Sequence, residues 1–166
     1  MIDYLEARLN EWLRLRLTAT GSSLLTVEFP PFESPGGREN PRNPILAEAC
    51  RQLQAYLDGD LRRFDLPLDP AGTPFQKQVW QQLLTIPYGE TRSYREVAQT
   101  IGAPRAVRAV GAANGANPIA IVIPCHRVIG SSGKLVGYGG GLDLKRRLLA
   151  LEKSASFALP LAAYSE

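Results

Sequence analysis

Histidine, cysteine and methionine are scarce in this sequence. Its 166 residues include one His, two Cys and one Met. Two cysteines can form at most one bridge, which is too few for the disulfide framework of a small secreted domain, so free thiols are expected. A single His and two distant Cys also lack the spacing of a zinc site, which would have to be built mostly from carboxylates. We therefore predict no bound metal.

A long apolar run is absent from the N-terminal region. The first twenty residues contain six charged side chains, which exclude a signal-peptide core or a membrane span there. The overall composition, 45% hydrophobic and 21% charged, is that of a globular protein with enough apolar material for a core. We expect a cytoplasmic protein that makes no membrane contact.

Positive charge is concentrated in the second half of the chain. Residues 1–71 hold 8 Lys and Arg against 11 Asp and Glu, a net charge of −3, whereas residues 72–166 hold 11 against 5, a net charge of +6. A turn signal at Asp69-Pro70-Ala71-Gly72 marks the division. The sequence therefore predicts an N-terminal domain over 1–71, a C-terminal domain over 72–153 and a tail over 154–166. The basic half favours a polyanion as partner.

The first half has the pattern of a sheet followed by a helix. Apolar residues alternate with polar ones over 13–17, and again at Leu25, Val27 and Phe29, as in strands of a hairpin or meander. Residues 30–44 are rich in Pro and Gly and predict a long surface loop. A helix over 44–58 follows, and Cys50 lies on its apolar face, so we expect Cys50 in the core.

Three helix starts can be identified in the second half. Thr73 and Pro74 suit the N-cap and first position of one helix, and Ser93-Tyr94-Arg95-Glu96 has the form of a capping box that starts a second. Gly102-Ala103-Pro104 ends that helix, and a third is expected over 105–113. Helix, short turn and helix form the signature of a helix-turn-helix, although the spacing alone fits a plain helical hairpin equally well.

An apolar run over 119–123 predicts a buried strand or extended segment that ends at Pro124. Glycines then crowd into residues 130–141 and indicate a loop that turns sharply or approaches a ligand closely. Asp143 is the expected cap of a last helix that carries Glu152 near its end.

Cys125 and His126 are the candidate chemical residues. A thiol is a good nucleophile only as thiolate, and its ordinary pKa of about 8.5 leaves little thiolate at neutral pH. The neighbouring His126 and the positive charge of Arg127 are expected to favour the thiolate. Neighbouring side chains of a strand point to opposite faces, so a turn after Pro124 or a bridging water would have to connect Cys125 with His126. For a Cys-His pair taken alone, a small buried hydrophobe beside an ordinary histidine is the alternative interpretation.

The stretch from Asn117 to Glu152 favours the chemical role of Cys125 and His126 over the alternative interpretation. It contains Asn117-Pro118, Ile123-Pro124-Cys125-His126-Arg127-Val128, Ser131-Ser132-Gly133, Gly137-Tyr138 and Gly140-Gly141-Leu142. In these motifs and their spacing it closely resembles the O6-alkylguanine-DNA alkyltransferases. The resemblance extends back to about Thr73, whereas the first 70 residues match only in general layout. It implies an α+β protein, with a small α/β N-terminal domain containing a β-sheet and a mainly helical C-terminal domain containing the helix-turn-helix.

The resemblance also implies the catalytic roles. Cys125 would accept the alkyl group, His126 would activate it through a water, and Glu152 would orient the imidazole. Tyr94 would donate a proton toward the departing guanine. Asn117 would fix the turn that precedes the active-site segment, which is nearly what an Asn before Pro118 does in any helix end.

Further positions would contact the substrate or DNA. Backbone carbonyls of Cys125 and Val128 would accept from the guanine amine, and the backbone N–H of Gly139, where many relatives have Ser, would donate to the alkylated oxygen. Arg108 would fill the space of a base rotated out of the duplex, with its helix in the minor groove; a solvated helix arginine is the alternative. The same resemblance assigns substrate or DNA contacts to Ser93, Arg105, Ala106, Ala109, Tyr138 and Lys145.

The predicted function is DNA repair by stoichiometric, irreversible and self-inactivating transfer of an alkyl group from O6-alkylguanine to Cys125, without a cofactor. O4-alkylthymine is a lesser expected substrate, and the partner is double-stranded DNA containing alkylated guanine. We expect a monomer that can bind DNA cooperatively. Two alternatives are an alkyltransferase-like protein, which recognises the lesion but lacks the acceptor cysteine, and a cysteine hydrolase that uses Cys125, His126 and Glu152.

Overall fold

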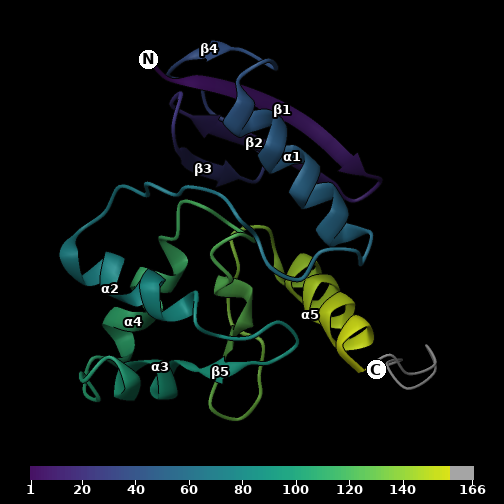
Figure 1. The fold of residues 1–166 in the computed structure, drawn as a ribbon. Coiled ribbons are helices and arrows are strands. Elements are labelled where there is room, and N and C mark those ends of the chain that lie inside the picture. Colours follow the sequence, from purple (N-terminus) through teal and green to yellow (C-terminus); the bar gives the residue numbers. More distant parts are fainter. Residues whose placement is uncertain (158–166) are drawn as a thin grey trace. The chain divides into compact units, whose positions relative to one another are not determined.

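The computed structural model describes residues 1–157, and the chain divides into two compact units. The first unit comprises Met1–Ala71 together with Pro118–Val122, and the second comprises Gly72–Asn117 and the chain from Ile123 onward. The predicted α+β class is confirmed: the first unit contains a sheet and a helix, and the second is mainly helical (Figure 1). Residues 118–122 belong to the first unit, although the boundaries predicted from the sequence assign them to the second.

A four-stranded sheet forms most of the first unit. Its strands are β1 (Asp3–Asn10), β2 (Leu13–Ala19), β3 (Leu24–Glu28) and β4 (Arg38–Glu39). Their order is β3-β2-β1-β4, in which β1 and β3 run antiparallel to β2 and β4 runs parallel to β1. Helix α1 (Pro44–Leu57) packs against β1, β2 and β3 (Figure 1).

The predicted leucines of β2 are buried, although Arg16 between them is buried too, whereas the alternation predicted for β3 is not observed. Leu13, Leu15 and Leu17 are buried, as the period of two requires. In β3 the buried residues are Leu24 and Val27, because the register with β2 shifts between Thr18 and Ala19. Of Leu25, Val27 and Phe29, whose alternation predicted this strand, only Val27 is buried.

Helix α1 begins at Pro44, as predicted, and Asn43 is its N-cap residue. The side chain of Asn43 accepts hydrogen bonds from the backbone N–H groups of Ile45 and Leu46, and Pro44 occupies the first turn. Cys50 is only half-buried, however, so its prediction as a core residue was wrong.

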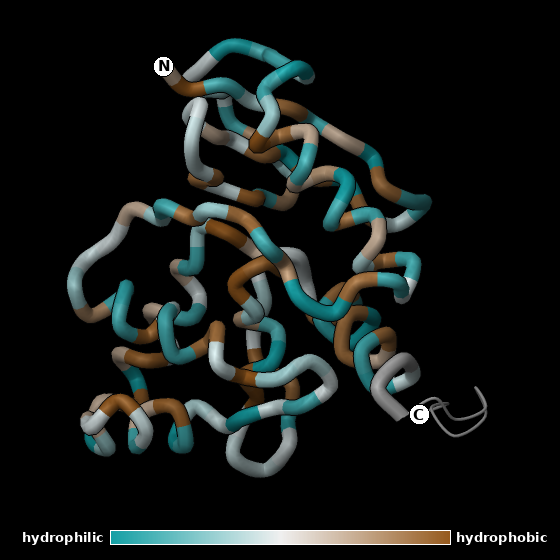
Figure 2. The backbone as a smooth tube through the Cα atoms, viewed as in Figure 1, coloured by the Kyte–Doolittle hydropathy of each residue, from teal (hydrophilic) through white to brown (hydrophobic). Residues whose placement is uncertain are grey.

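The second unit consists of short helices and one pair of two-residue strands. In chain order these are α2 (Pro74–Leu83), β5 (Arg92–Ser93), α3 (Tyr94–Thr100), α4 (Val107–Gly115), the 3₁₀ turn η1 (Cys125–Arg127), β6 (Val128–Ile129) and α5 (Leu142–Phe157). Thr73 and Ser93 each form a complete capping box. Hydrophobic and hydrophilic segments alternate along these helices (Figure 2), as expected for helices with one buried face. Among residues 1–157, no helix is long and apolar enough to span a membrane.

Three helix boundaries differ from the prediction. Helix α4 begins at Val107, so Arg105 precedes it and Ala106 is its N-cap residue. Helix α5 begins at Leu142, which places Asp143 in the first turn and not at the cap. The same helix continues to Phe157, so residues 154–157 of the predicted tail are helical, and residues 158–166 lie outside the described residues.

The apolar run over 119–123 is buried but does not form a regular strand. Ile119 makes a single parallel bridge to Val27. Ile121 has a φ of 71°, and the N–H of Val122 donates to the carbonyl of Ala120 at 2.8 Å, which is a γ-turn. A β-branched residue in this conformation is an outlier, so the surrounding packing must hold it there.

Candidate active site

A tight turn places Cys125 and its neighbours. Pro124 has φ −81° and ψ 63°, and the N–H of Cys125 donates to the carbonyl of Ile123 at 2.8 Å, which together define an inverse γ-turn. The next three residues form η1, and all three are buried. Because η1 is a 3₁₀ turn and not a strand, the alternation that would separate Cys125 from His126 does not apply here.

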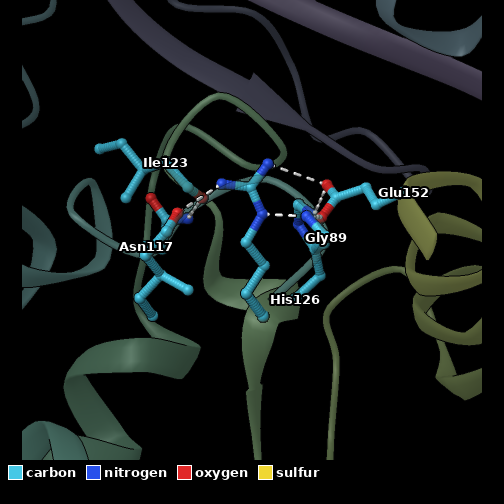
Figure 3. Close-up of polar contacts among 7 residues, drawn as sticks. Gly89, Asn117, Ile123, His126 and Glu152 are labelled. Carbon is cyan, nitrogen blue, oxygen red and sulfur yellow. Dashed lines mark hydrogen bonds and ion pairs between the residues drawn. The ribbon is translucent and has the colours of Figure 1, made fainter. Parts of the chain in front are cut away.

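His126 and Glu152 are brought together in the interior. The His126 Nε2 lies 2.7 Å from the Glu152 Oε2, and both side chains are buried. Figure 3 shows Glu152 reaching His126 from α5, with Gly89 beside them. A carboxylate can only accept, so Nε2 carries the proton of a neutral ring, and Nδ1 is then the nitrogen that can accept one.

Arg127 forms a two-pronged ion pair with the same carboxylate. Its Nε lies 2.8 Å from Oε1 and its Nη2 lies 3.0 Å from Oε2, while Nη1 donates to the carbonyl of Ile86 at 2.8 Å. The N–H of Gly89 adds a fourth donor, 3.3 Å from Oε1. Burial acts to raise the pKa of Glu152, but the bonds from His126 and Arg127 outweigh it and hold the pKa well below its usual value.

The charge that favours the thiolate comes from Lys145. Burial raises the pKa of the Cys125 thiol, while a hydrogen bond with Asn117 and the charge of Lys145 oppose the increase. Arg127 pairs with Glu152, and an effect of its charge on Cys125 stays a prediction. Burial also lowers the pKa of His126, against the opposing effect of Glu152. The resting pair is consequently a neutral thiol beside a neutral imidazole.

Asn117 has two contacts in this region. Its Nδ2 donates to the carbonyl of Ile123 at 2.8 Å, which spans the turn before Cys125 (Figure 3). The same side chain lies close enough to Cys125 to influence the pKa of the thiol. The structure therefore adds a contact with the nucleophile to the predicted turn-fixing contact.

Tyr94 and Lys145 hold the loop between β6 and α5. The Tyr94 hydroxyl donates to the carbonyl of Val136 at 3.1 Å. The fully buried Lys145 donates from Nζ to the carbonyls of Val128, Val136 and Gly137 at 2.7, 3.2 and 3.3 Å. Tyr138, from the same loop, meets the His126 ring edge-on, with centroids 6.5 Å apart. The loop thus faces the active-site turn.

The remaining predicted contact residues are found outside this buried network. Arg105, Arg108 and Ala109 are exposed around the start of α4, Ala106 is half-buried, and Gly139 is exposed in the loop. Ser93 caps α3, where its hydroxyl accepts from the N–H of Glu96 at 3.0 Å.

Asn114 is a site residue that the sequence analysis missed. It is buried in α4 and its Nδ2 lies 3.4 Å from the Cys125 carbonyl oxygen. A signal existed, since Val110 is four residues earlier and also buried, so the helical period places a polar residue on the buried face. Within residues 1–157, no group of His, Cys, Asp and Glu is arranged to hold a metal ion.

Comparison with known proteins identifies the family. Residues 74–154 match the model of the 6-O-methylguanine DNA methyltransferase DNA-binding domain, and residues 14–70 match that of the ribonuclease-like domain of the same enzymes. The chain belongs to the 6-O-methylguanine DNA methyltransferase family.

Relatives in this methyltransferase family cover most of the chain. The methylated-DNA–protein-cysteine methyltransferase of Mycobacterium tuberculosis is 68% identical over 142 residues, which are 84% of this chain and 86% of that protein. That of Methanosarcina barkeri is 65% identical over 110 residues, 66% of this chain and 70% of that protein. A crystal structure of M. tuberculosis OGT in complex with DNA has a TM-score of 0.86 and 52% identity, covering 92% of this chain and 94% of that one. The fold and the enzyme class predicted from the sequence are thereby confirmed.

Proposed function

We propose that this methyltransferase repairs DNA by moving the alkyl group of O6-alkylguanine onto the Sγ of its own Cys125. The observation that carries the proposal is the buried turn that places Cys125 next to the His126–Glu152–Arg127 network. Family membership supports it, because the relatives are named as methylated-DNA–protein-cysteine methyltransferases and one was crystallised with DNA.

The reaction can be written with the groups at hand. The thiol proton passes through a water to Nδ1 of neutral His126, and Glu152 stabilises the imidazolium. The sulfur attacks the alkyl carbon, an S–C bond forms, and the C–O bond to guanine breaks. Tyr94 gives a proton to the departing guanine, so that a neutral base leaves, and the phenol is restored by the proton taken from the thiol. The net result is a thioether on Cys125 and an intact guanine.

Substrate access follows from the exposed and the backbone groups. Arg108 lies exposed on α4, where it can enter the duplex as the damaged base is rotated out into the site. Helices α3 and α4 then act as the helix-turn-helix. Carbonyls of Cys125 and Val128 and the N–H of Gly139 read the base, and O4-alkylthymine is a poorer substrate.

The protein is consumed by one reaction. A thioether is not cleaved by a thiol or by water under mild conditions, and Cys50, the second cysteine, is half-buried with a pKa raised by burial. Each molecule therefore repairs one lesion. It acts as a monomer that can bind DNA cooperatively, with residues 72–153 making the chemical and DNA contacts.

The test is the mass of the intact protein after mixing with a duplex that contains one O6-methylguanine. We expect one added methyl group, mapped to Cys125, in the parent and in a Cys50→Ser control, and none in Cys125→Ser. An unchanged parent mass despite tight binding to the lesion would instead describe a damage-recognition protein. Turnover of an ester without DNA affinity would describe a cysteine hydrolase.

A further inference from the structure

Asn114 is a buried amide in a helix built largely from small apolar residues. It lies in the third turn of α4, and only 6% of it is exposed. Burying an amide costs free energy unless each of its polar atoms has a partner. What the nitrogen and the oxygen of this amide meet therefore indicates the role of the residue.

The nitrogen of the amide faces the backbone of the nucleophile. Asn114 Nδ2 donates to the Cys125 carbonyl oxygen across 3.4 Å, and the N–H of Val128 donates to the same oxygen. A carbonyl oxygen has two lone pairs, and these two donors engage both. Of the two carbonyls proposed above to read the guanine amine, that of Cys125 therefore has no lone pair left for it.

The oxygen of the same amide is an acceptor without a donor. Among the residues that the structure describes, none donates a hydrogen bond to Asn114 Oδ1, although this atom is buried. The contact with Cys125 fixes which end of the amide is the oxygen, because a carbonyl only accepts and the amide must present its N–H₂ group there. A buried acceptor is unfavourable until a donor reaches it, so Oδ1 suits an N–H group of a bound molecule.

The face of α4 that carries Asn114 borders both groups that the proposed reaction uses. A Cβ atom added at Gly111 would lie 3.9 Å from Cδ1 of Tyr94, the proposed proton donor. Gly111 and Asn114 are three residues apart and share this face, from which Nδ2 reaches Cys125. Depth does not separate the amide from a substrate, since Cys125, which the alkyl carbon must reach, is itself only 7% exposed.

The lesion offers one group that matches this acceptor. The exocyclic amine carries the only N–H groups of an O6-alkylguanine base, because alkylation at O6 leaves N1 without a hydrogen. O4-alkylthymine has no N–H group at all. A buried acceptor in this place distinguishes the two lesions, since it gains a partner from the guanine and stays unpaired beside the thymine.

We propose that Asn114 is a specificity-determining residue whose Oδ1 accepts a hydrogen bond from the exocyclic amine of the lesion, in the role given above to the Cys125 carbonyl. The inference rests on the alkyl transfer proposed above. The bond from Nδ2 to Cys125 fixes the amide before the base arrives, and the second hydrogen of the amine goes to the Val128 carbonyl. Asn114 touches neither the sulfur nor the alkyl carbon, so its loss should change the choice of base more than the chemical step.

The central experiment compares two duplexes that differ by one amine. One contains O6-methylguanine and the other O6-methylhypoxanthine, which lacks the exocyclic amine, and the second-order rate constant of methyl transfer is measured for each. Asn114→Leu keeps the approximate shape of the side chain and removes the acceptor. One hydrogen bond of ordinary strength corresponds to about a ten-fold change in rate, so the preference of the parent for O6-methylguanine should shrink about ten-fold in the variant.

A duplex that contains O4-methylthymine gives a second readout. This base has no amine, so its rate constant should change less than that of O6-methylguanine when Asn114 is replaced by Leu. The preference for the guanine lesion over the thymine lesion should therefore narrow as well. General damage to the fold would lower all three rate constants by a similar factor and leave both preferences as they are in the parent.

Val110→Ala is the matched control, since it removes buried atoms from the same helix one turn before Asn114. It should lower stability and keep both preferences of the parent, because no acceptor is lost. If Asn114→Leu folds poorly, Asn114→Ser, which adds no bulk and is too short to take the place of the amide, must narrow both preferences.

The proposed function and the role of Asn114 fail in different ways. A parent that gains no methyl group from O6-methylguanine overturns the proposed function. A parent that reacts but shows no preference for O6-methylguanine over O6-methylhypoxanthine overturns only the role of Asn114. Asn114 variants that keep the preferences of the parent, at equal or at uniformly lower rates, also overturn that role and leave the amide a structural residue.

Discussion

Replacing Arg127 by Met should destabilise the protein strongly, although the residue is not expected to touch the substrate. Arg127 supplies two of the four hydrogen bonds to the Glu152 carboxylate and satisfies the carbonyl of Ile86. Both partners of this ion pair are buried. Removing one member of a buried pair leaves an uncompensated charge, which costs about 3–5 kcal/mol.

The loss can be measured by urea unfolding. With a slope of about 2 kcal/mol per molar urea, a cost of this size moves the midpoint down by about 1.5–2.5 M. Arg146→Met is the matched control, because Arg146 pairs with Asp143 on the exposed surface of α5. Exposed ion pairs contribute little, so that midpoint should hardly move. Equal midpoints for the two variants would refute the assignment of Arg127 as the main counter-charge of Glu152.

The same variant should change the pH dependence of alkyl transfer. The charge of Arg127 is one of the causes that lower the pKa of His126, and Glu152 acts in the opposite direction. Without Arg127, Glu152 is left with His126 as its cation, and the pKa of His126 rises. The acid limb of the rate profile should therefore move to higher pH in Arg127→Met and stay in place in Arg146→Met. An acid limb that moves to lower pH would contradict the argument.

Three further outcomes are expected. In the parent, the rate of transfer should be independent of pH above 6.5 and should fall only as pH drops through the lowered pKa of His126. A ten-fold increase in rate per pH unit up to 8.5 would instead indicate that a preformed thiolate of Cys125 reacts. Lys145→Met should slow transfer at least ten-fold and speed hydrogen exchange in residues 130–140, because three carbonyls lose a buried donor. Lys153→Met, an exposed change on the same helix, should have neither effect. Hydrogen bonds from Asn43, Arg38 and Asn40 lower the pKa of Asp3 from 3.8 to about 2, so its contribution to stability is present above pH 4 and is lost as pH falls toward 2. Asp3→Asn should therefore flatten the dependence of stability on pH in that window. An unchanged dependence would count against these bonds.

Short sequence motifs predicted the helices whose starts depend on residues close together in the chain. Helices α2 and α3 were expected because Thr73 is a good N-cap and Ser93 begins a capping box, and both caps form. Helix α1 was expected from Pro44 in its first turn and from the helical spacing of its apolar residues. Strand β1 was missed, although Leu5, Ala7 and Leu9 alternate along it with the exposed Glu6 and Arg8. Strands β5 and β6 are two residues each, and 34 residues separate the end of β5 at Ser93 from the start of β6 at Val128. No window of sequence contains both partners, so no periodicity can reveal that pairing.

In the active site, too, the sequence identified residues but not the contacts between distant parts of the chain. Cys125, His126 and Glu152 were identified from motif and spacing, and the structure brings them together. The sequence could not show how charge is distributed among them. Whether Arg127 or Lys145 influences the thiol depends on contacts between residues far apart in the chain, and here Arg127 reaches Ile86, 41 residues away.

A protonated resting Cys125 would suit the single-turnover reaction proposed above. A thiolate exposed to solvent reacts with oxidants and with free alkylating agents, and each such event would consume a molecule before it reached DNA. Burial raises the pKa of the thiol and so disfavours the thiolate. The same burial keeps His126 neutral and hence able to take a proton, while Glu152 and Arg127 provide a fixed, nearly neutral pair behind it. On the proposed function, the thiolate forms only as its proton is transferred to His126 with the lesion in place. On that proposal, the raised pKa protects the nucleophile until it meets a lesion and does not oppose the reaction itself.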